Sequence, residues 1–372
     1  MIVPGFSAGP NDWAIPALLA LSRALARRHE IHVFSQRYPA RGCFTFDGLT
    51  HHALGGGQRF GLASIQIWLR TALAVIRQHR ETPFDLLHAF WADEAGLSAA
   101  LAGARIQRPV VVSLGGGELT RLPAIDYGAQ RFLARRLTTR YALRRASRVT
   151  AGSNYQLDLC RAQGVEEGRL RLAPFGVDTG RFRPAGPPTS ALSANPARRA
   201  LVQAASLIPV KNQRLLLEIV ARVKQALPGI RLNLAGNGPL QSELRQLADQ
   251  LGIGANVVWH QHLPYPELPQ FYRQAHLYLQ TSWHESQGMA VLEAMACGLP
   301  VLGTPAGVVR DVACRPAQTS KEALAAQVVE VLSDADLYRQ MSRQARRRVE
   351  EEFSLPVTAE NFTSIYRELA GG

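Results

Sequence analysis

Lysine is almost missing from this sequence of 372 residues: Lys211, Lys224 and Lys321 are the only lysines among 42 basic residues. The first 183 residues contain none, and their 24 arginines against 13 acidic residues give this half a net charge of +11. Eight arginines lie between Arg121 and Arg148, and a basic face of this kind suits anionic lipid or nucleic acid. No signature of a nucleic-acid-binding module accompanies them, so we expect an anionic membrane surface as partner and no nucleic acid. The alternative is a solvated or partly packed basic helix.

Cysteine and long apolar runs are also scarce. The four cysteines are scattered, without a Cys-x-x-Cys pair and without a histidine at metal-ligand spacing, which favours a reduced compartment and argues against zinc. We expect no metal and no cofactor. No apolar run reaches membrane-spanning length, and no positive residue precedes the apolar residues 14–21, as one would in an export signal. We therefore expect a cytoplasmic protein, peripheral on the inner face of the membrane where its basic half docks.

Short apolar runs alternate with helical patterns along most of the chain, which is typical of parallel, doubly wound α/β sheets. The alternation stops once, in a Pro- and Ser-rich stretch with the composition of a linker, and then restarts. The pattern predicts a first domain over 1–183, a linker over 184–198, a second domain over 199–352 and a last helix within 353–372. Two such domains would face each other across a cleft at the carboxyl ends of their strands.

The residues that suggest chemistry are concentrated in 284–302, His-Glu-Ser-Gln-Gly-Met-Ala-Val-Leu-Glu-Ala-Met-Ala-Cys-Gly-Leu-Pro-Val-Leu. Good helix formers fill Met289–Cys297, and the glycine and proline that follow end the helix. Gly288 and Met289 then lie at a helix N-terminus, where free N–H groups and the helix dipole favour anions.

Two carboxylates accompany this helix start. Glu285 lies in the loop before it, and Glu293 lies one to two turns inside it, at most about 12 Å further along at helical rise. A sugar joined to a ribose through two phosphates is of similar length, so one carboxylate could hold sugar hydroxyls while the other holds the ribose diol. The simpler alternative is an ordinary packed helix that carries two glutamates.

The run Glu-x7-Glu followed by Ala-Met-Ala-Cys-Gly-Leu-Pro-Val resembles the signature of the retaining GT-B glycosyltransferases of family 4, the glycosyl transferases group 1. Further segments resemble motifs of that family: Gly-Val-Asp at 176–178, the run 206–211 at the place of its Arg-Leu-x-x-x-Lys, and Gly-Asn-Gly-Pro at 236–239. The resemblance implies the GT-B fold with two Rossmann-like domains. The second domain would bind a nucleotide sugar, the first would bind a glycan or lipid-linked acceptor, and the last helix would cross back to the first domain.

The resemblance also gives roles to matched residues. Lys211 would neutralise the leaving diphosphate and Glu285 would bind the sugar hydroxyls, so these two are the expected catalytic residues. Glu293 would bind the ribose hydroxyls. The other expected donor-binding residues are Gly288, Met289, Ser206, Gly236, Asn237, Gly238 and Gly9. The leaving phosphate oxygen would itself take the acceptor proton, so no protein base is assigned.

The sequence departs from the family pattern at two positions. Ser206 replaces the family's diphosphate-binding arginine, and Gly115 stands where a histidine is often found near the sugar. His88 and Glu118 are candidates on the acceptor side, with a core or a capping role as the simpler explanation of each.

We therefore expect a retaining, metal-independent glycosyltransferase, most simply a hexosyltransferase, that acts in bacterial envelope or exopolysaccharide synthesis. Two alternatives stay open. One is another GT-B enzyme, such as a sugar-nucleotide epimerase or a phosphorylase. The other is a non-catalytic, nucleotide-sugar-binding partner subunit, which the two departures would explain.

Overall fold

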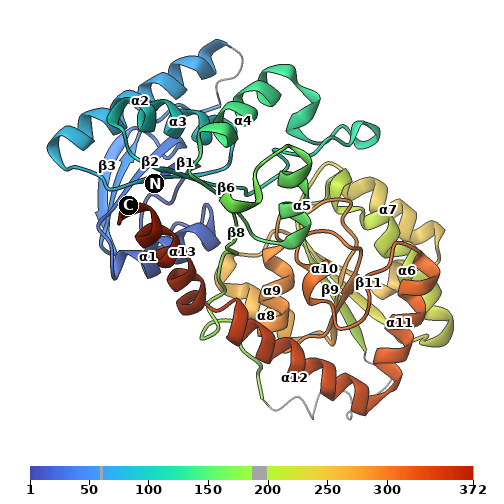
Figure 1. Ribbon diagram of the computed structural model, residues 1–372. Helices are drawn as coiled ribbons and strands as arrows, with labels where there is room; N and C mark the ends of the chain where they lie inside the picture. Colours follow the sequence, from blue (N-terminus) through green and yellow to red (C-terminus); the bar gives the residue numbers. More distant parts are fainter. Residues whose placement is uncertain (59–61, 187–198, 372) are drawn as a thin grey trace. The chain divides into compact units, whose positions relative to one another are not determined.

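The computed structural model describes residues 1–58, 62–186 and 199–371, which form two compact units (Figure 1). The first unit combines Met1–Gly176 with Leu355–Gly372, and the second consists of Val177–Ser354. The chain therefore passes from one unit to the other twice. The first crossing precedes the boundary predicted at residue 183, and the second follows the one predicted at 352. Most of the predicted linker, 187–198, lies outside the described residues.

The first unit contains an eight-stranded sheet in the order β3-β4-β2-β1-β5-β6-β7-β8. Neighbouring strands run parallel, except that β3 pairs antiparallel with β4. The central strands β5 and β6 are buried from end to end, as expected for parallel strands covered on both faces. The strands are β1 (Ile2–Gly5), β2 (Ile31–Tyr38), β3 (Gly42–Phe46), β4 (Leu49–Ala53), β5 (Leu87–Phe90), β6 (Val110–Ser113), β7 (Arg148–Ala151) and β8 (Leu170–Leu172).

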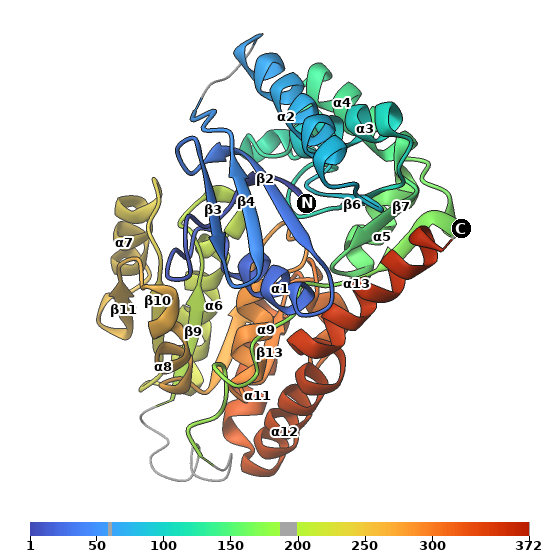
Figure 2. The ribbon, with the colours of Figure 1, turned by 90° about the vertical axis from the view of Figure 1, so that its left-hand side faces the viewer.

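Helices cover both faces of this sheet. Figure 2 shows α2, α3 and α4 on one side of the strands, and α1 with α13 on the other. Each side has its own apolar core, and α13 contributes Phe362, Ile365 and Tyr366 to the core that it shares with α1. The helices are α1 (Pro16–Ala26), α2 (Leu62–Glu81), α3 (Glu94–Ile106), α4 (Leu133–Arg145), α5 (Asn154–Ala162) and α13 (Leu355–Ala370). Short 3-10 helices occupy Pro123–Ile125, Ala129–Arg131 and Glu167–Arg169.

The second unit contains a five-stranded, all-parallel sheet in the order β11-β10-β9-β12-β13. Its strands are β9 (Ala200–Ala204), β10 (Arg231–Ala235), β11 (Val257–His260), β12 (Leu277–Gln280) and β13 (Val301–Gly303). Its helices are α6 (Gln213–Ala226), α7 (Gln241–Gln250), α8 (Leu268–Arg273), α9 (Met289–Ala296), α10 (Val309–Val312), α11 (Lys321–Ser333) and α12 (Ala335–Glu352), with 3-10 turns at Pro209–Lys211, Gly254–Asn256 and Tyr265–Glu267. The prediction of two α/β domains with parallel sheets is thus confirmed.

Helix α9 matches the local expectation closely. It begins at Met289 with Gly288 as its N-cap, and Gly288 adopts a φ of 96° that L residues rarely take. At the other end Gly298 has a φ of 84°, which is the left-handed residue that commonly ends a helix. Within the described residues, no helix has the length and apolar character needed to cross a membrane.

Candidate donor-binding site

The predicted donor-binding residues of the second unit gather at one edge of its sheet. Ser206 follows β9, Gly236–Gly238 follow β10, and Glu285 follows β12. Because β9 lies between β10 and β12 and all three run parallel, the loops after them meet at the same carboxyl edge. This is the edge at which open α/β sheets bind ligands.

Lys211 and Glu285 form an ion pair at this edge. Lys211 Nζ lies 2.5 Å from Glu285 Oε1, and the same oxygen accepts hydrogen bonds of 2.8 Å from Gln280 Nε2 and from Ser282 Oγ. Burial by itself would raise the pKa of Glu285, but the Lys211 ammonium and the hydrogen bonds from Lys211 and Ser282 outweigh it, so the pKa lies below its usual value. Glu285 is therefore ionised and held in one orientation.

Backbone and hydroxyl contacts fix the loop that carries Lys211 to the loop that carries Glu285. Trp283 N donates to Val210 O at 2.8 Å, and Thr281 Oγ1 donates to Lys211 O at 3.1 Å. Lys211 itself ends a 3-10 turn, after which Asn212 adopts a left-handed conformation. The ion pair is thus set by two loops that are bonded to each other.

Glu293 has the opposite electrostatic character. It points from α9 into the protein, where its side chain is 6% exposed and Oε2 accepts a hydrogen bond of 3.0 Å from the Tyr272 hydroxyl. Burial raises the pKa of Glu293 to about 7, although the bond from Tyr272 partly offsets this effect. Near neutral pH this carboxyl is therefore close to the midpoint of its titration, whereas Glu285 is ionised.

The glycine loop after β10 has a clear steric requirement. A Cβ on Gly236 would lie 2.0 Å from the carbonyl oxygen of Ala205, and one on Gly238 would lie 2.2 Å from that of Leu207. Asn237 O accepts a hydrogen bond of 2.9 Å from Leu207 N. The two glycines thus let this loop pack directly on the loop that contains Ser206, whose side chain is exposed.

Several residues of the site carry no signal in the sequence. Gln280, Ser282 and Tyr272 are the hydrogen-bond partners of the two glutamates, and each reads as an ordinary residue of a strand, loop or helix. Gly307 is similar: it has a φ of 58°, and a Cβ there would lie 2.6 Å from the Cβ of Glu285. A glycine after β13 could have suggested that the backbone lies close to another residue, but the sequence does not indicate that this residue is Glu285.

The remaining predicted residues belong to the first unit. Gly9 lies in a turn closed by a hydrogen bond of 3.2 Å from Asp12 N to Gly9 O. His88 is buried, with Nδ1 2.6 Å from the Tyr366 hydroxyl and Nε2 2.7 Å from Ser113 Oγ, and burial lowers its pKa well below the usual value. Both ring nitrogens are thus used inside the core, as in the simpler explanation of this residue.

Glu118 also fits its simpler explanation, as a cap of backbone groups. Its carboxylate accepts hydrogen bonds from the N–H groups of Ala92, Gly115 and Gly116, at 3.3, 3.1 and 2.6 Å. Burial, followed by the nearby charge of Asp93, raises the pKa of Glu118 to about 7. The described residues hold no group of three or more His, Cys, Asp or Glu side chains that could bind a metal ion.

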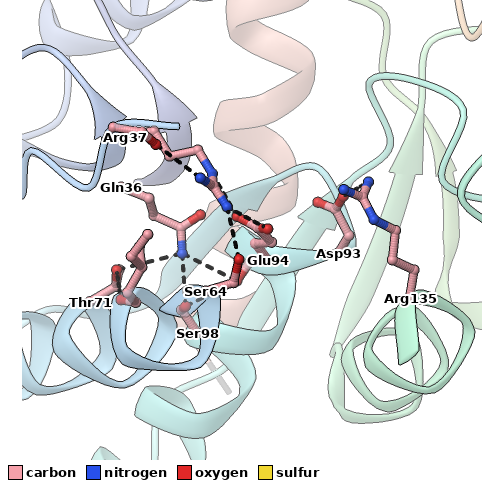
Figure 3. Close-up of polar contacts among 10 residues, drawn as sticks. Gln36, Arg37, Ser64, Thr71, Asp93, Glu94, Ser98 and Arg135 are labelled. Carbon is pink, nitrogen blue, oxygen red and sulfur yellow. Dashed lines mark hydrogen bonds and ion pairs between the residues drawn. The ribbon is translucent and has the colours of Figure 1, made fainter. Parts of the chain in front are cut away.

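A second polar cluster lies at the carboxyl edge of the first sheet (Figure 3). Arg37, at the end of β2, pairs with Glu94 through Nη2 and Oε1 at 2.7 Å and through Nε and Oε2 at 2.9 Å. The residue before it in sequence, Asp93, lies 3.6 Å from Arg135 of α4. The N-cap residue of α3 and its first residue are thus held by arginines from two different elements.

Comparisons with known proteins agree with this architecture. Residues 17–181 match the family model "Glycosyltransferase Family 4", and residues 191–348 match "Glycosyl transferases group 1". The D-inositol 3-phosphate glycosyltransferase of Segniliparus rotundus is 30% identical over 217 residues, which are 55% of this chain and 48% of that protein. A GDP-mannose-dependent alpha-(1-6)-phosphatidylinositol monomannoside mannosyltransferase of Mycolicibacterium smegmatis is 29% identical over 45% of this chain and 48% of its own. The chain thus spans about half the length of these curated relatives.

Solved structures resemble the whole chain. Anabaena Alr3699/HepE, determined in complex with UDP and glucose, has a TM-score of 0.74 at 19% identity and covers 99% of both chains. Sucrose-phosphate synthase from Thermosynechococcus elongatus has a TM-score of 0.78 at 18% identity, over 100% of this chain and 99% of its own. With two parallel α/β units, the fold is that of GT-B proteins. Because the two family models together match most of the chain, it belongs to the GT-B glycosyltransferases of family 4, the glycosyl transferases group 1.

Proposed function

We propose that this protein is a retaining, metal-independent glycosyltransferase that moves a sugar from a nucleotide-diphosphate sugar to a glycan or lipid-linked acceptor, in bacterial envelope or exopolysaccharide synthesis. The observation that carries the proposal is the Lys211–Glu285 pair at the carboxyl edge of the second sheet. The pair offers a cation for a leaving diphosphate and an ionised carboxylate for sugar hydroxyls in one fixed arrangement.

In the proposed reaction the bond between the sugar's anomeric carbon and the diphosphate oxygen breaks, and a bond to the acceptor oxygen forms on the same face. The departing diphosphate oxygen takes the proton of the acceptor hydroxyl. Negative charge develops on the diphosphate, so Lys211 and the N–H groups of Gly288 and Met289 at the start of α9 would stabilise the transition state. Glu285 would orient the sugar, which lowers the entropy cost of reaching that state.

Glu293 would bind the ribose hydroxyls of the donor. Its carboxyl is buried and has one hydrogen bond from Tyr272, so acceptor capacity remains on its oxygens. The nucleotide is a nucleoside diphosphate in this proposal: UDP is bound in the HepE structure, and the mycobacterial relative is named for GDP-mannose. Support for an anionic membrane as partner comes from the charge of the first 183 residues.

Two measurements on purified protein test the proposal. Thermal shift with UDP and GDP would identify the nucleotide, because a ligand that binds the folded state raises the melting temperature. Release of nucleoside diphosphate from the matching nucleotide sugar, in the presence of a chelator, would then show transfer or hydrolysis without a metal. The anomeric configuration of the product, read by NMR, decides between retention and inversion.

Variants separate the two glutamates. Glu293→Ala should weaken nucleotide-sugar binding by about 1–3 kcal/mol, the range for losing a charged hydrogen bond. Glu285→Ala should lower turnover more than donor affinity, because its contact matters most as charge develops on the sugar. Equal and negligible effects of both substitutions on affinity and turnover would reject the two-carboxylate arrangement.

A non-catalytic, nucleotide-sugar-binding subunit is the second candidate, and Ser206 is the observation in its favour. Its exposed side chain stands at the site edge where the family pattern has an arginine, which removes one cation from the diphosphate site. Binding of a nucleotide sugar without hydrolysis or transfer would support this candidate. A reaction that needs no acceptor, or that depends on inorganic phosphate, would instead indicate an epimerase or a phosphorylase.

A further inference from the structure

Exposed apolar side chains are concentrated on one side of the first unit. Eleven large apolar side chains are exposed among the described residues, and seven of them belong to α2, to α4 or to the residue directly before α4. These seven are between 38% and 67% exposed. They are Ile65, Leu69 and Leu73 on α2, and Phe132, Leu133, Leu137 and Tyr141 on or next to α4. We call these seven residues, with the arginines of α4, the apolar–arginine face.

The spacing of these residues places them in two stripes. On each helix three of them recur every four positions, which aligns them along one side of a helix. Both helices pack against α3 and lie with it in one layer over the sheet (Figure 1). The stripes therefore lie on neighbouring parts of one helical layer of a single unit.

The beginning of α4 extends beyond the rest of this layer. A Cβ on Gly96, near the start of α3, would lie 3.0 Å from the Cβ of Ala142, so the close contact between the two helices involves the second half of α4. The nine residues of α4 before Ala142 correspond to about 13 Å of helix at the standard rise. Every side chain from Phe132 to Leu137 is exposed. These residues project at the carboxyl edge of the sheet, because helices that follow parallel strands begin at that edge.

The charge of this face is entirely positive on α4. The helix carries Arg135, Arg136, Arg140, Arg144 and Arg145 and no acidic residue. Within the described part of the chain, Arg136 and Arg140 form no ion pair, and both are exposed. Two copies of this chain would repel each other through such a face, whereas an anionic surface would be attracted.

We propose that the apolar–arginine face docks on an anionic lipid bilayer, with the projecting start of α4 entering the headgroup region. The apolar side chains would enter the boundary with the acyl chains, while the arginines would extend to lipid phosphates. Charge alone predicted an anionic membrane surface as the partner of the basic first half, without showing which side chains of the fold meet it. The structure adds the apolar stripe of α2 and the orientation, in which the layer of α2 and α4 faces the bilayer and the carboxyl edge of the first sheet, where both helices begin, lies beside it.

That orientation has a consequence for the acceptor, which rests on the proposed function. Arg135 connects the projecting helix start to Asp93, which follows β5 at the same edge (Figure 3). If the first unit binds the acceptor at this edge, the acceptor hydroxyl is presented beside the bilayer surface. The acceptor class is then a sugar or polyol carried on a lipid.

Vesicle co-sedimentation of the full chain tests the docking. Vesicles of phosphatidylcholine are compared with vesicles that also contain phosphatidylglycerol, at low and at high salt. Wild-type protein should bind only the anionic vesicles, and less at high salt. The double variant Arg136→Gln with Arg140→Gln should bind about 30-fold more weakly, and Leu133→Ser with Leu137→Ser at least about tenfold more weakly.

Matched controls lie in the second unit. Val258→Ser removes an exposed apolar side chain, and Arg347→Gln an exposed arginine that faces Glu351 at 3.9 Å. Both should bind as wild type does. Circular dichroism melts of all variants verify the fold, and hydrogen exchange should show vesicle-dependent protection of α2 and α4.

Three results would overturn the docking: no binding to anionic vesicles at low salt, equal binding by the α4 variants and the controls, or wild-type dimers that the same substitutions dissociate. The acceptor class is tested separately, by comparing transfer to lipid-carried and to water-soluble acceptors. Vesicle binding without any transfer would contradict the proposed function and leave the docking intact. Transfer by a protein that does not bind vesicles would contradict the docking and leave the proposed function intact.

Discussion

Glu285 and Glu293 belong to one segment and are both buried, yet their pKa values shift in opposite directions. The difference is the partner. Glu285 faces the Lys211 ammonium, whereas Glu293 has only the Tyr272 hydroxyl, which stabilises a carboxylate much less. At neutral pH the site thus contains one fixed negative charge and one carboxyl near its midpoint of titration.

Lys211→Met should lower the free energy of unfolding by about 2–4 kcal/mol at neutral pH, because it leaves a buried carboxylate without its cation. In the wild type, Glu285 has a folded-state pKa below its unfolded value, so its stabilising contribution is present above about pH 4.5 and lost below it. In the variant, the hydrogen bonds from Gln280 and Ser282 remain but the ammonium is lost, so burial is less opposed and the pKa of Glu285 rises. Urea unfolding at several pH values should therefore show the two proteins converging as the pH falls.

Lys224→Met is the matched control for that series. Lys224 lies in the same unit and donates a single exposed hydrogen bond of 2.7 Å to Gly252 O. It should change stability little at any pH and should leave nucleotide-sugar turnover intact, whereas Lys211→Met should abolish most turnover. A pH-independent loss in Lys211→Met would mean that Lys211 acts through packing and not through the charge of Glu285.

Glu293→Gln should remove a pH dependence of stability. The folded-state pKa of about 7 lies above the ordinary value of 4.5, so this group stabilises the fold fully below the unfolded pKa and loses that contribution as the pH rises to about 7. Relative to the variant, wild-type stability should thus fall by up to about 1.4 kcal/mol per pH unit in this window, and then level off. Glu118 titrates in both proteins and cancels in the difference. Parallel stability curves would contradict the raised pKa.

At the scale of elements, much of the second sheet and its helix α9 follow from the sequence, because apolar runs and end signals such as Gly298 and Pro300 act locally. The hairpin of β3 and β4 is different. Strand β3 has no buried residue, whereas β4 buries Leu49, His51 and Ala53. The dipeptide Asp47-Gly48 between them, with φ values of 52° and 76°, is a typical hairpin turn. That dipeptide is the feature of the sequence from which the hairpin could have been predicted.

The site could be predicted only in part. The motifs place Lys211 and Glu285 in loops after two strands, but their contact depends on β9 and β12 being neighbours, and strand order is a property of the whole sheet. The partners Gln280 and Tyr272 are likewise set by packing. The spacing of residues along the chain therefore predicts neither the contact between Lys211 and Glu285 nor the hydrogen-bond partners of the two glutamates.

Helix α9 allows a test of the proposed diphosphate site, because a glycine with positive φ lies at each of its ends and substitution causes similar backbone strain at both. Gly288→Ala and Gly298→Ala each force an L residue into a left-handed conformation, which should lower stability by about 1–2 kcal/mol in both variants. Only Gly288→Ala alters the N–H groups proposed to face the diphosphate. Calorimetry should therefore show UDP or GDP affinity reduced about fivefold in Gly288→Ala and unchanged in Gly298→Ala. Equal loss in both variants would place the diphosphate elsewhere.

At the scale of the molecule, the second unit is one continuous segment, Val177–Ser354, with its own apolar cores. It also contains every proposed donor-binding residue except Gly9. Expressed alone, residues 177–354 should therefore fold cooperatively and bind the nucleoside diphosphate within about tenfold of the affinity of the full chain, since a tenfold change is about 1.4 kcal/mol. Calorimetry on both proteins is the measurement. A folded fragment without affinity would show that the first unit supplies an essential part of the site.

The return of α13 to the first unit also determines the order in which the protein can be completed during synthesis. A ribosome makes residues 177–354 as an unbroken stretch, and the apolar cores of the second unit need no residue beyond Ser354. The first unit differs, because Phe362 and Tyr366, which share a core with α1, are translated only after the whole second unit. The first unit is thus begun before the second unit and completed after it, and until then the apolar side of α1 is available to chaperones.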